Sequence, residues 1–403
     1  MTVHVSSTAT TSDRSDPPWR MWAAAWLITA VFILSNSATP LYVLWQAEIG
    51  FTSVILTAIF AAYIVGLLAA LLVAGQLSDR YGRKVILIPG LVSAIVACFL
   101  FATAQHVAML VAARLLSGMA VGVIVSAGMA SVVDLGGLER RKQASLVASV
   151  AMVLGAGLGP LLAGVLAQTF ARPVIPTFSV ELIILVSALA VAALLPLKRP
   201  PHRTGDNWRL HLPSVPEANR RHLAFGIAVF GPGITATSFV LSLGPSLLSK
   251  LLGVTSPLIA GGMACAMFLT ATGVQFAVKS LRVRNIFLFG SAAAILSMLG
   301  VISAVNTSVA AILVVAALLA GASQGLGQLG GLTLIGLHVP TLRRAEANAV
   351  LNFGGYIPAG LLPVATGYLI DRVGLSTGAG TFAAALGVCA AAGAIFVFLS
   401  QHD

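Results

Sequence analysis

The sequence predicts an all-α membrane protein of about twelve transmembrane helices, arranged as two pseudo-symmetric six-helix halves. Three observations predict this class. Hydrophobic residues make up 58% of the 403 residues and the mean hydropathy is +0.99, which is more apolar surface than a soluble domain of this length can bury. The apolar residues also fall in long runs, and a set of motifs recurs in the second half of the chain at a constant spacing.

The apolar runs set the predicted helices, because about 20 apolar residues cross the hydrocarbon core of a bilayer. They cover residues 21–44, 53–77, 85–104, 108–132, 144–167, 174–197, 223–247, 258–278, 286–305, 309–337, 345–370 and 376–399. The polar stretch 198–222 is rich in proline and basic residues and predicts a linker. The expected domains are therefore a tail at 1–20, a first half at 21–197, this linker, a second half at 223–399 and a tail at 400–403.

The positive charges give the expected orientation. Arg172, Lys250 and Arg372 follow odd-numbered helices, and Arg114 lies inside the fourth helix. The other 19 of the 23 Lys and Arg residues (23 − 4) therefore lie in the tails or after even-numbered helices. The positive-inside rule then places both tails and the linker in the cytoplasm of a multi-pass protein of the cell inner (plasma) membrane. The net charge of +11 therefore reflects orientation and contact with anionic lipid, and no nucleic-acid partner is expected.

Motifs of the first half recur 203 positions later (for example 321 − 118). The matched sets are Gly118, Gly122 and Gly128 with Gly321, Gly325 and Gly331; Arg140 and Arg141 with Arg343 and Arg344; and Gly157, Pro160 and Gly164 with Gly360, Pro363 and Gly367. A single offset that aligns a proline and an Arg-Arg pair as well as glycines indicates an internal repeat. Parallel repeats about an axis along the membrane normal are a transporter architecture, with the substrate site between the halves.

The chain offers little to enzyme chemistry. Cys98, Cys265 and Cys389 lie in apolar runs and are interpreted as small buried thiols, without disulfides. The seven histidines are scattered, and no metal-ligand spacing, phosphate loop or Ser/His/Asp set is present. We therefore expect no enzyme activity, no metal and no cofactor.

The stretch "GQLSDRYGRK" at 75–84 places four charges in six residues of a chain that is only 9% charged. It lies between the second and third predicted helices and resembles the loop 2–3 signature of the major facilitator superfamily, GxLaDrxGrkxxl. The positions that match are Gly75, Asp79, Arg80, Gly82, Arg83 and Lys84. The resemblance extends to the twelve helices, the repeat and the central linker, and it implies a transporter that works by alternating access.

The chemistry of this segment suits a conformational latch. Gly75 and Gly82 permit close approach and a tight turn, and Asp79 can face a helix N-terminus in the other half. Arg83 needs a carboxylate, for which Asp134 at the end of the fourth helix is the nearest candidate along the chain. In the resembled family such a charge relay holds the outward-open state. The counterpart at 278–285, "VKSLRVRN", lacks the acid and the glycines, so a complete latch is expected on one side only.

Two further stretches resemble the same superfamily. Arg114 with Gly118 and Gly122 is similar to its RxxxGxxxG pattern. The stretch 155–164 is similar to gxxxGPxxGG, a signature associated with proton-driven exporters, although Ala163 replaces one of the final glycines. The residues expected to pack helices closely or to act as a hinge are Gly118, Gly122, Gly155, Gly159, Pro160 and Gly164. The same residues would also fit ordinary packing in any membrane bundle.

Three charged residues are candidates for proton or charge coupling. Arg114 and Glu181 lie within predicted helices at a similar depth of roughly 10 Å, so we expect them to pair. Two interpretations stay open: a static structural pair, which we favour for Glu181, or a carboxylate that is released to take a proton. Glu48 at the rim of the first helix is the third candidate and is more typical of a solvated acid.

Polar residues on the first, seventh, tenth and eleventh helices predict the substrate cavity. The candidates are Asn36, Tyr42, Gln46, Thr235, Gln324, Gln328, Asn352 and Tyr356. Each by itself is more typical of an interhelical hydrogen bond than of a ligand contact. Together they predict a mostly neutral cavity of amides and aromatics, which suits a lipophilic or weakly polar solute.

The expected function is therefore export of drug-like or amphipathic small molecules in exchange for protons. The expected partners are the small-molecule substrate, protons and the lipid bilayer, and the expected state is a monomer. One alternative is a transporter of a specific metabolite, such as a sugar or an amino acid, with the same fold. A weaker alternative is a non-transporting membrane sensor.

Overall fold

In the computed structural model, the chain is helical throughout the residues that it describes, which are 17–137, 139–197, 217–278, 280–340 and 343–400. Most of the predicted tails and most of the predicted linker lie outside these ranges. Within them, twelve spans are long and apolar enough to cross a membrane, which confirms the all-α membrane class.

The twelve spans are built from fourteen α-helices in the described residues. The first half of the chain supplies α1 (Pro18–Ser37), α2 (Tyr42–Ile49), α3 (Ser53–Tyr81), α4 (Arg83–Ala102), α5 (Val107–Val123), α6 (Met129–Gly136), α7 (Arg141–Thr169) and α8 (Val174–Leu194). The second half supplies α9 (Glu217–Ser246), α10 (Pro257–Val278), α11 (Val283–Thr307), α12 (Ala310–His338), α13 (Arg344–Val373) and α14 (Leu375–Ser400).

Three spans contain short irregular turns. A 3₁₀ turn at Thr39–Leu41, which includes Pro40, joins α1 to α2 within the first span. A π-helical turn at Ile124–Gly128 interrupts the fourth span, and another at Leu247–Leu251 ends the seventh. Such turns replace the regular α-helical hydrogen bonds over a few residues, and sharp kinks of long helices often occur at irregular turns of this kind.

A single residue, Gly82, separates α3 from α4. Its φ angle of +99° lies in the region that side chains with a Cβ rarely adopt. The chain therefore reverses within one residue, and Arg83 comes back beside the last turn of α3. This tight reversal matches the turn that the sequence predicts at Gly82.

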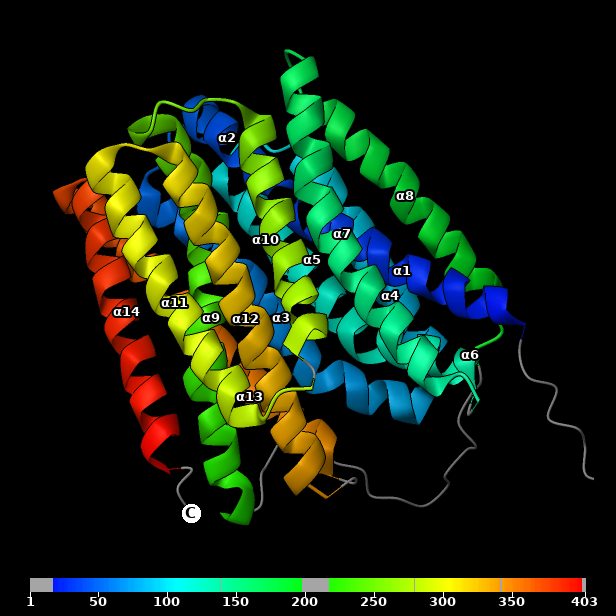
Figure 1. Cartoon of the computed structure of the whole chain (residues 1–403). Coiled ribbons are helices and arrows are strands. Elements are labelled where there is room, and N and C mark those ends of the chain that lie inside the picture. The colour runs from blue at the N-terminus through cyan, green and yellow to red at the C-terminus, as the bar shows by residue number, and fades with distance from the viewer. Residues whose placement is uncertain (1–16, 138, 198–216, 279, 341–342, 401–403) are drawn as a thin grey trace, which may run out of the picture.

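The internal repeat is visible in the helix bounds. α7 begins at Arg141 and α13 at Arg344, while α5 begins at Val107 and α12 at Ala310, and both pairs differ by 203 positions (344 − 141 and 310 − 107). Two seams join the first half of the chain to the second: α3 packs against α13, and α7 packs against α10 (Figure 1). The same offset carries α3 onto α10 and α7 onto α13, so the two seams are related by pseudo-symmetry.

The two ends of the bundle are named here by their connections. The proximal end carries Gly82 and the connections at 139–140 and 280–282, and it is the end predicted to be cytoplasmic. The distal end, at the top of Figure 1, carries the connections at 50–52, 170–173 and 252–256 and Gly374.

Candidate functional site

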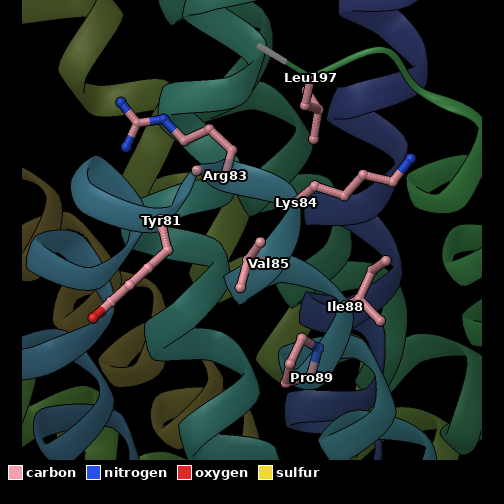
Figure 2. A pocket seen from close by; sticks show the side chains of 8 residues that line it. Tyr81, Arg83, Lys84, Val85, Ile88, Pro89 and Leu197 are labelled. Atoms are coloured by element: carbon pink, nitrogen blue, oxygen red, sulfur yellow. The ribbon is translucent and has the colours of Figure 1, made fainter. Parts of the chain in front are cut away.

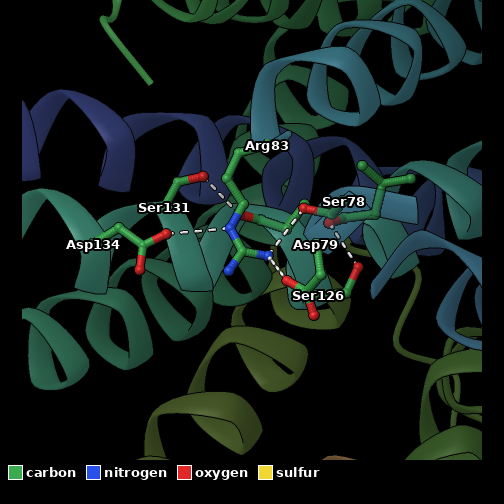
Figure 3. Close-up of polar contacts among 8 residues, drawn as sticks. Ser78, Asp79, Arg83, Ser126, Ser131 and Asp134 are labelled. Carbon is green, nitrogen blue, oxygen red and sulfur yellow. Dashed lines mark hydrogen bonds and ion pairs between the residues drawn. The ribbon is translucent and has the colours of Figure 1, made fainter. Parts of the chain in front are cut away.

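The charge-dense segment forms a hydrogen-bonded cluster around Arg83, the first residue of α4 (Figure 3). The guanidinium donates to the Asp79 carboxylate at 2.6 Å and to the Ser78 hydroxyl at 3.0 Å, both near the end of α3. Its Nε donates to the Asp134 carboxylate on α6 at 3.2 Å. This proximal cluster of Ser78, Asp79, Arg83 and Asp134 therefore ties together the ends of three helices.

The proximal cluster fixes geometry more than it stabilises the fold. The Arg83 side chain is 22% exposed, but Asp79 is 70% exposed and Asp134 is 54% exposed. Ion pairs with such exposed partners contribute at most about 1 kcal/mol to folding. What the cluster does is hold one guanidinium between two carboxylates, so that the turn between α3 and α4 keeps one orientation relative to α6.

Two details differ from the sequence-based expectation. The Asp79 carboxylate binds Arg83 of its own half instead of facing a helix terminus of the other half, because the turn at Gly82 brings Arg83 back to it. A Cβ added to Gly75 would have as its nearest neighbour the Ser126 Cβ at 4.0 Å, so Gly75 makes no tight helix contact in this conformation.

An open hollow of about 420 Å³ lies beside the proximal cluster (Figure 2). Figure 2 shows that Lys84 points away from Arg83, and its Nζ donates to the Ala193 carbonyl at 2.5 Å. The lining consists of Tyr81, Gly82, Arg83, Lys84, Val85, Ile88, Pro89 and Leu197. All of these residues belong to the first half of the chain, so the hollow is not a substrate site between the halves.

Arg114 on α5 is fully buried at 0% exposure. Its Nε donates to the Tyr42 hydroxyl, and its Nη1 donates to the Ser35 carbonyl at 2.5 Å. The Cζ atom also lies between 5.1 and 5.8 Å from the ring centroids of Tyr42, Phe60, Tyr63 and Phe101. The cation is thus stabilised by an aromatic cage and two acceptors, while Nη2 has no hydrogen-bond partner among the described residues.

The expected pair between Arg114 and Glu181 is wrong in this structure. Glu181 on α8 is 1% exposed, and neither of its carboxyl oxygens has a hydrogen-bond partner among the described residues. The Ser37 hydroxyl faces it but donates to the Ile33 carbonyl at 2.7 Å. Glu181 is the one acidic residue that is buried in the part of the chain that the structure describes.

The reason for the missing pair lies in the direction of each side chain. α8 packs mainly against α1 and α4, whereas α5 packs mainly against α3 and α4. Arg114 contacts the Phe101 ring, Phe101 stacks on Phe178 at 5.2 Å, and Phe178 lies one turn before Glu181 on α8. The rings of Phe101 and Phe178 therefore follow one another between the surroundings of Arg114 and those of Glu181, and a similar depth in the membrane does not bring the two charges together.

The third charged candidate, Glu48, lies at the distal end of α2 and its side chain is exposed. This position agrees with the interpretation of a solvated rim acid.

The glycines and the proline predicted to act in packing are contact points. A Cβ on Gly118 would overlap the Tyr63 carbonyl oxygen of α3, and one on Gly122 would lie 2.6 Å from the Ala70 Cβ. On α7, Gly155 and Gly159 meet α1 in the same way. Gly164 and the Pro160 carbonyl meet α10, since a Cβ on Gly164 would lie 2.7 Å from the Pro257 carbonyl oxygen. The small residues of α7 thus allow close packing against α1 within the first half and against α10 in the seam between the halves.

The predicted cavity residues of the first half divide into two groups. Asn36 is 7% exposed and donates to the Ser35 hydroxyl at 3.0 Å. Tyr42 and Gln46 have other polar partners in this structure. Tyr42 is buried against Arg114, and Gln46 lies at the distal end, where Lys250 of the second half donates to its amide oxygen at 2.8 Å.

The cavity candidates of the second half mostly bond within their own helices. Thr235 donates to the Gly231 carbonyl at 2.7 Å, and Asn352 donates to the Asn348 carbonyl at 2.8 Å. Gln324 keeps a buried amide oxygen without a partner among the described residues, and Gln328 is half-buried on the same helix. Tyr356 packs edge-on against Phe230, with ring centroids 6.3 Å apart.

Tyr63 was not among the predicted cavity residues. It lies on α3, near Tyr356 of α13, so the pair faces across a seam. An aromatic residue inside a long apolar run carries no signal of this role, and only the pairing of α3 with α13 reveals it.

The distal contacts between the halves were also not predicted. Asp371 of α13 accepts two hydrogen bonds from the backbone at the start of α3. Ser256, just before α10, donates to the Gln168 amide oxygen near the end of α7 at 3.0 Å. Together with the bond between Lys250 and Gln46, these contacts join the two halves at the distal end.

The comparison with known protein families agrees with the two equivalent seams, the twelve spans and the charged turn after the second span. The sequence profile of the Major Facilitator Superfamily matches residues 21–358 of this chain. The chain belongs to the major facilitator superfamily.

Relatives within the superfamily include transporters of different kinds. Multidrug resistance protein 1 of Bacillus subtilis is 31% identical over 138 residues, covering 34% of each protein. A triacylglyceride transporter of Mycolicibacterium smegmatis is 36% identical over 107 residues, covering 26% of this chain and 19% of the relative. The chain thus aligns with about a third or less of the length of these relatives.

Solved structures extend the likeness to the whole fold. The nucleoside transporter NupG matches with a TM-score of 0.74 and 13% sequence identity, covering 94% of this chain and 99% of that one. At this identity the likeness is one of fold. Together with the family match and the twelve spans, it gives this chain the multi-pass membrane fold of the major facilitator superfamily.

Proposed function

We propose that this chain is a secondary active transporter that exports drug-like or other amphipathic small molecules in exchange for protons. The observation that carries the coupling is the buried carboxyl of Glu181, which has no hydrogen-bond partner among the described residues. An ionised carboxyl is costly at such a site, and binding a proton removes the charge. A group that gains and loses a proton during the cycle needs to be free of a permanent ion pair.

The substrate class rests on the polar groups near the middle of the bundle. Asn36, Gln324, Asn352 and Tyr356 are neutral, and the aromatic residues Phe230 and Tyr63 lie among them or face them. Neutral amides and rings suit an amphipathic solute. The likeness to a multidrug resistance protein supports the same class.

A second candidate function is transport of one specific metabolite. The fold likeness to a nucleoside transporter and the unpartnered amide oxygen of Gln324 favour it, because a buried acceptor can select a substrate with a matching donor. Both candidates share the alternating-access fold and differ in the breadth of the substrates.

Growth assays should distinguish the two candidates. Expression in a bacterium that lacks its own efflux pumps is expected to raise its resistance to several chemically different amphipathic antibiotics and dyes. Collapse of the pH gradient should abolish the resistance. A protein that protects against none of the compounds, but takes up or releases one metabolite, would support the second candidate.

The proposed orientation, with the distal end outside the cell, can be tested by cysteine labelling. A membrane-impermeant maleimide added to intact cells is expected to label Arg172→Cys at the distal end but not Arg141→Cys at the proximal end, in a background without the native cysteines. Labelling of both positions after the cells are permeabilised is the control. Labelling of Arg141→Cys in intact cells would overturn the orientation.

A further inference from the structure

The distal end of the seam between α3 and α13 carries an unusual helix cap. The Asp371 carboxylate, on the last turn of α13, accepts hydrogen bonds from the backbone N–H groups of Ser53 and Val54, each at 2.9 Å. These N–H groups belong to the first turn of α3, and the residue before that turn, Thr52, makes no side-chain cap bond. The cap of α3 is therefore supplied by the other half of the protein.

We call this contact between Asp371 and the start of α3 a clasp. The internal repeat provides a second clasp at the equivalent place. The offset of 203 positions carries Ser53 onto Ser256 (256 − 53) and Gln168 onto Asp371 (371 − 168). In the seam between α7 and α10, the Ser256 hydroxyl donates to the Gln168 amide oxygen at 3.0 Å. One pair of equivalent positions thus makes contact twice, once in each seam.

A glycine brings the helices together in both seams. A Cβ on Gly367 would lie 2.7 Å from the Ser53 carbonyl oxygen, and one on Gly164 would lie 2.7 Å from the Pro257 carbonyl oxygen. Each glycine precedes the capping residue by four positions (371 − 367 and 168 − 164), so it lies on the same helical face. The helices therefore approach each other closely at a glycine in both clasps, and the two clasps differ in the hydrogen bonds that they make.

The chemical difference has a cause in the backbone. Val54 offers an N–H to Asp371, but its equivalent is Pro257 (257 − 54 = 203), which has no N–H. The seam between α7 and α10 can therefore use a neutral hydroxyl-to-amide bond, whereas the seam between α3 and α13 has a carboxylate on two backbone donors at the positive end of a helix. Charge-assisted bonds of this kind are roughly twice as strong as neutral ones.

We propose that two unequal clasps hold the distal end shut, and that the cap of α3 by Asp371 is the dominant one. Opening of the distal end must break this cap and leave the first turn of α3 uncapped. The seam between α7 and α10 loses only a neutral hydrogen bond. The cap thus sets the population of the distal-closed state, independently of which substrate is carried or in which direction.

The proposal can be tested by measuring the distance between the halves without any substrate. Spin labels at Ala171→Cys and Ser376→Cys, exposed positions of the first and second halves at the distal end, report the opening by double electron–electron resonance in detergent and in lipid nanodiscs. The three native cysteines are replaced beforehand. The change to test is Asp371→Ala, and Asp371→Asn serves as a second variant that keeps one acceptor and the volume.

Loss of the cap is expected to raise the ratio of distal-open to distal-closed protein about tenfold, which corresponds to about 1.4 kcal/mol and lies within the range measured for helix-capping side chains. Asp371→Asn should give a smaller increase in the same direction. Gln168→Ala should change the ratio less than Asp371→Ala. Arg372→Gln, which changes the charge of the neighbouring residue without touching the cap, should leave the distances as in the unaltered protein.

Three results would overturn the proposal. Unchanged distances in both Asp371 variants would mean that the cap does not hold the closed state. A shift in Gln168→Ala as large as in Asp371→Ala would mean that the clasps are equal. An equal shift in Arg372→Gln would assign the effect to general charge at this end. If Asp371→Ala does not give a monodisperse protein, Asp371→Asn and Gln168→Ala still decide the order of the clasps.

Discussion

Asp79→Asn is expected to reduce transport about tenfold while leaving the stability of the protein within about 0.5 kcal/mol of the unaltered one. The two effects separate because Asp79 is 70% exposed, so its ion pair adds little to folding, yet it holds the Arg83 guanidinium beside Asp134. If the proximal cluster has different partners in the two end states, losing a charge-assisted hydrogen bond shifts their balance. Uptake or efflux by reconstituted protein, alongside a thermal melt, measures both quantities.

The chain supplies a matched control for this variant. Arg282 stands at the position equivalent to Asp79 (282 − 79 = 203), immediately before α11, and its side chain is exposed. The second half has neither the acid nor the glycines of the signature, so Arg282→Gln should transport nearly normally. Equal and small losses in the two variants would refute the role of the proximal cluster as an asymmetric latch.

Features that depend on local sequence were predicted well. The apolar runs gave twelve spans because the membrane requires a minimum length of helix, and the turn at Gly82 was predicted because only glycine adopts its φ angle easily. The partnership of Arg83 with Asp134 also followed from sequence. Their helices are consecutive spans that end at the same side of the bundle, and few other acids are available.

Features that depend on the face of the helix on which a side chain lies were not predicted from the sequence. Arg114 and Glu181 lie at similar depth, but depth fixes only the height along the membrane normal. Aromatic rings then took the place of the acid as the partners of Arg114, because a cage of four rings and two oxygen acceptors can stabilise a buried cation. The contact between Tyr42 and Arg114 was not predicted for the same reason: the sequence indicates the helix of Tyr42 but not the face on which its side chain lies.

The distal clasps were missed for a different reason. Asp371 looks like an ordinary charged residue at a helix end, and Ser53 looks like the polar start of a helix. The repeat offset already related them to Gln168 and Ser256, but an offset shows equivalence and not contact. Contact became visible once α3 was found against α13 and α7 against α10, since equivalent seams then bring equivalent residues together.

Glu181→Met is expected to stabilise the protein by about 1–2 kcal/mol and to abolish proton-driven transport. The stabilisation follows because a buried polar group without a partner costs about 1–3 kcal/mol, and methionine fills a similar volume without that cost. The loss of transport follows from the proposed role of the carboxyl in binding the coupling proton. Thermal melts and transport driven by an imposed pH gradient measure the two effects, and equilibrium binding of a transported compound should be unchanged.

Arg114 provides the contrasting measurement. Arg114→Gln removes both hydrogen bonds and the contacts with four rings, so it should destabilise the protein, with hydrogen bonds to a charged group worth roughly 1.5–3 kcal/mol each. Because the structure does not pair the two residues, the changes in stability caused by Arg114→Gln and Glu181→Gln should add to within about 0.5 kcal/mol in the double variant.

A double variant that is more stable than Glu181→Gln alone would be evidence that the two residues form an ion pair in solution. In that case Glu181→Met should not stabilise the protein either. If instead Glu181→Met is more stable than the unaltered protein but still shows transport driven by a pH gradient, the carboxyl is a buried group without a hydrogen-bond partner that has no part in coupling. The proton must then bind elsewhere, and the proposed exchange with protons would lose the observation on which it rests. The proposed role of Glu181 therefore requires a Glu181→Met variant that is more stable and has lost proton-driven transport. That result would show that the free energy lost by burying the carboxyl is retained for its function.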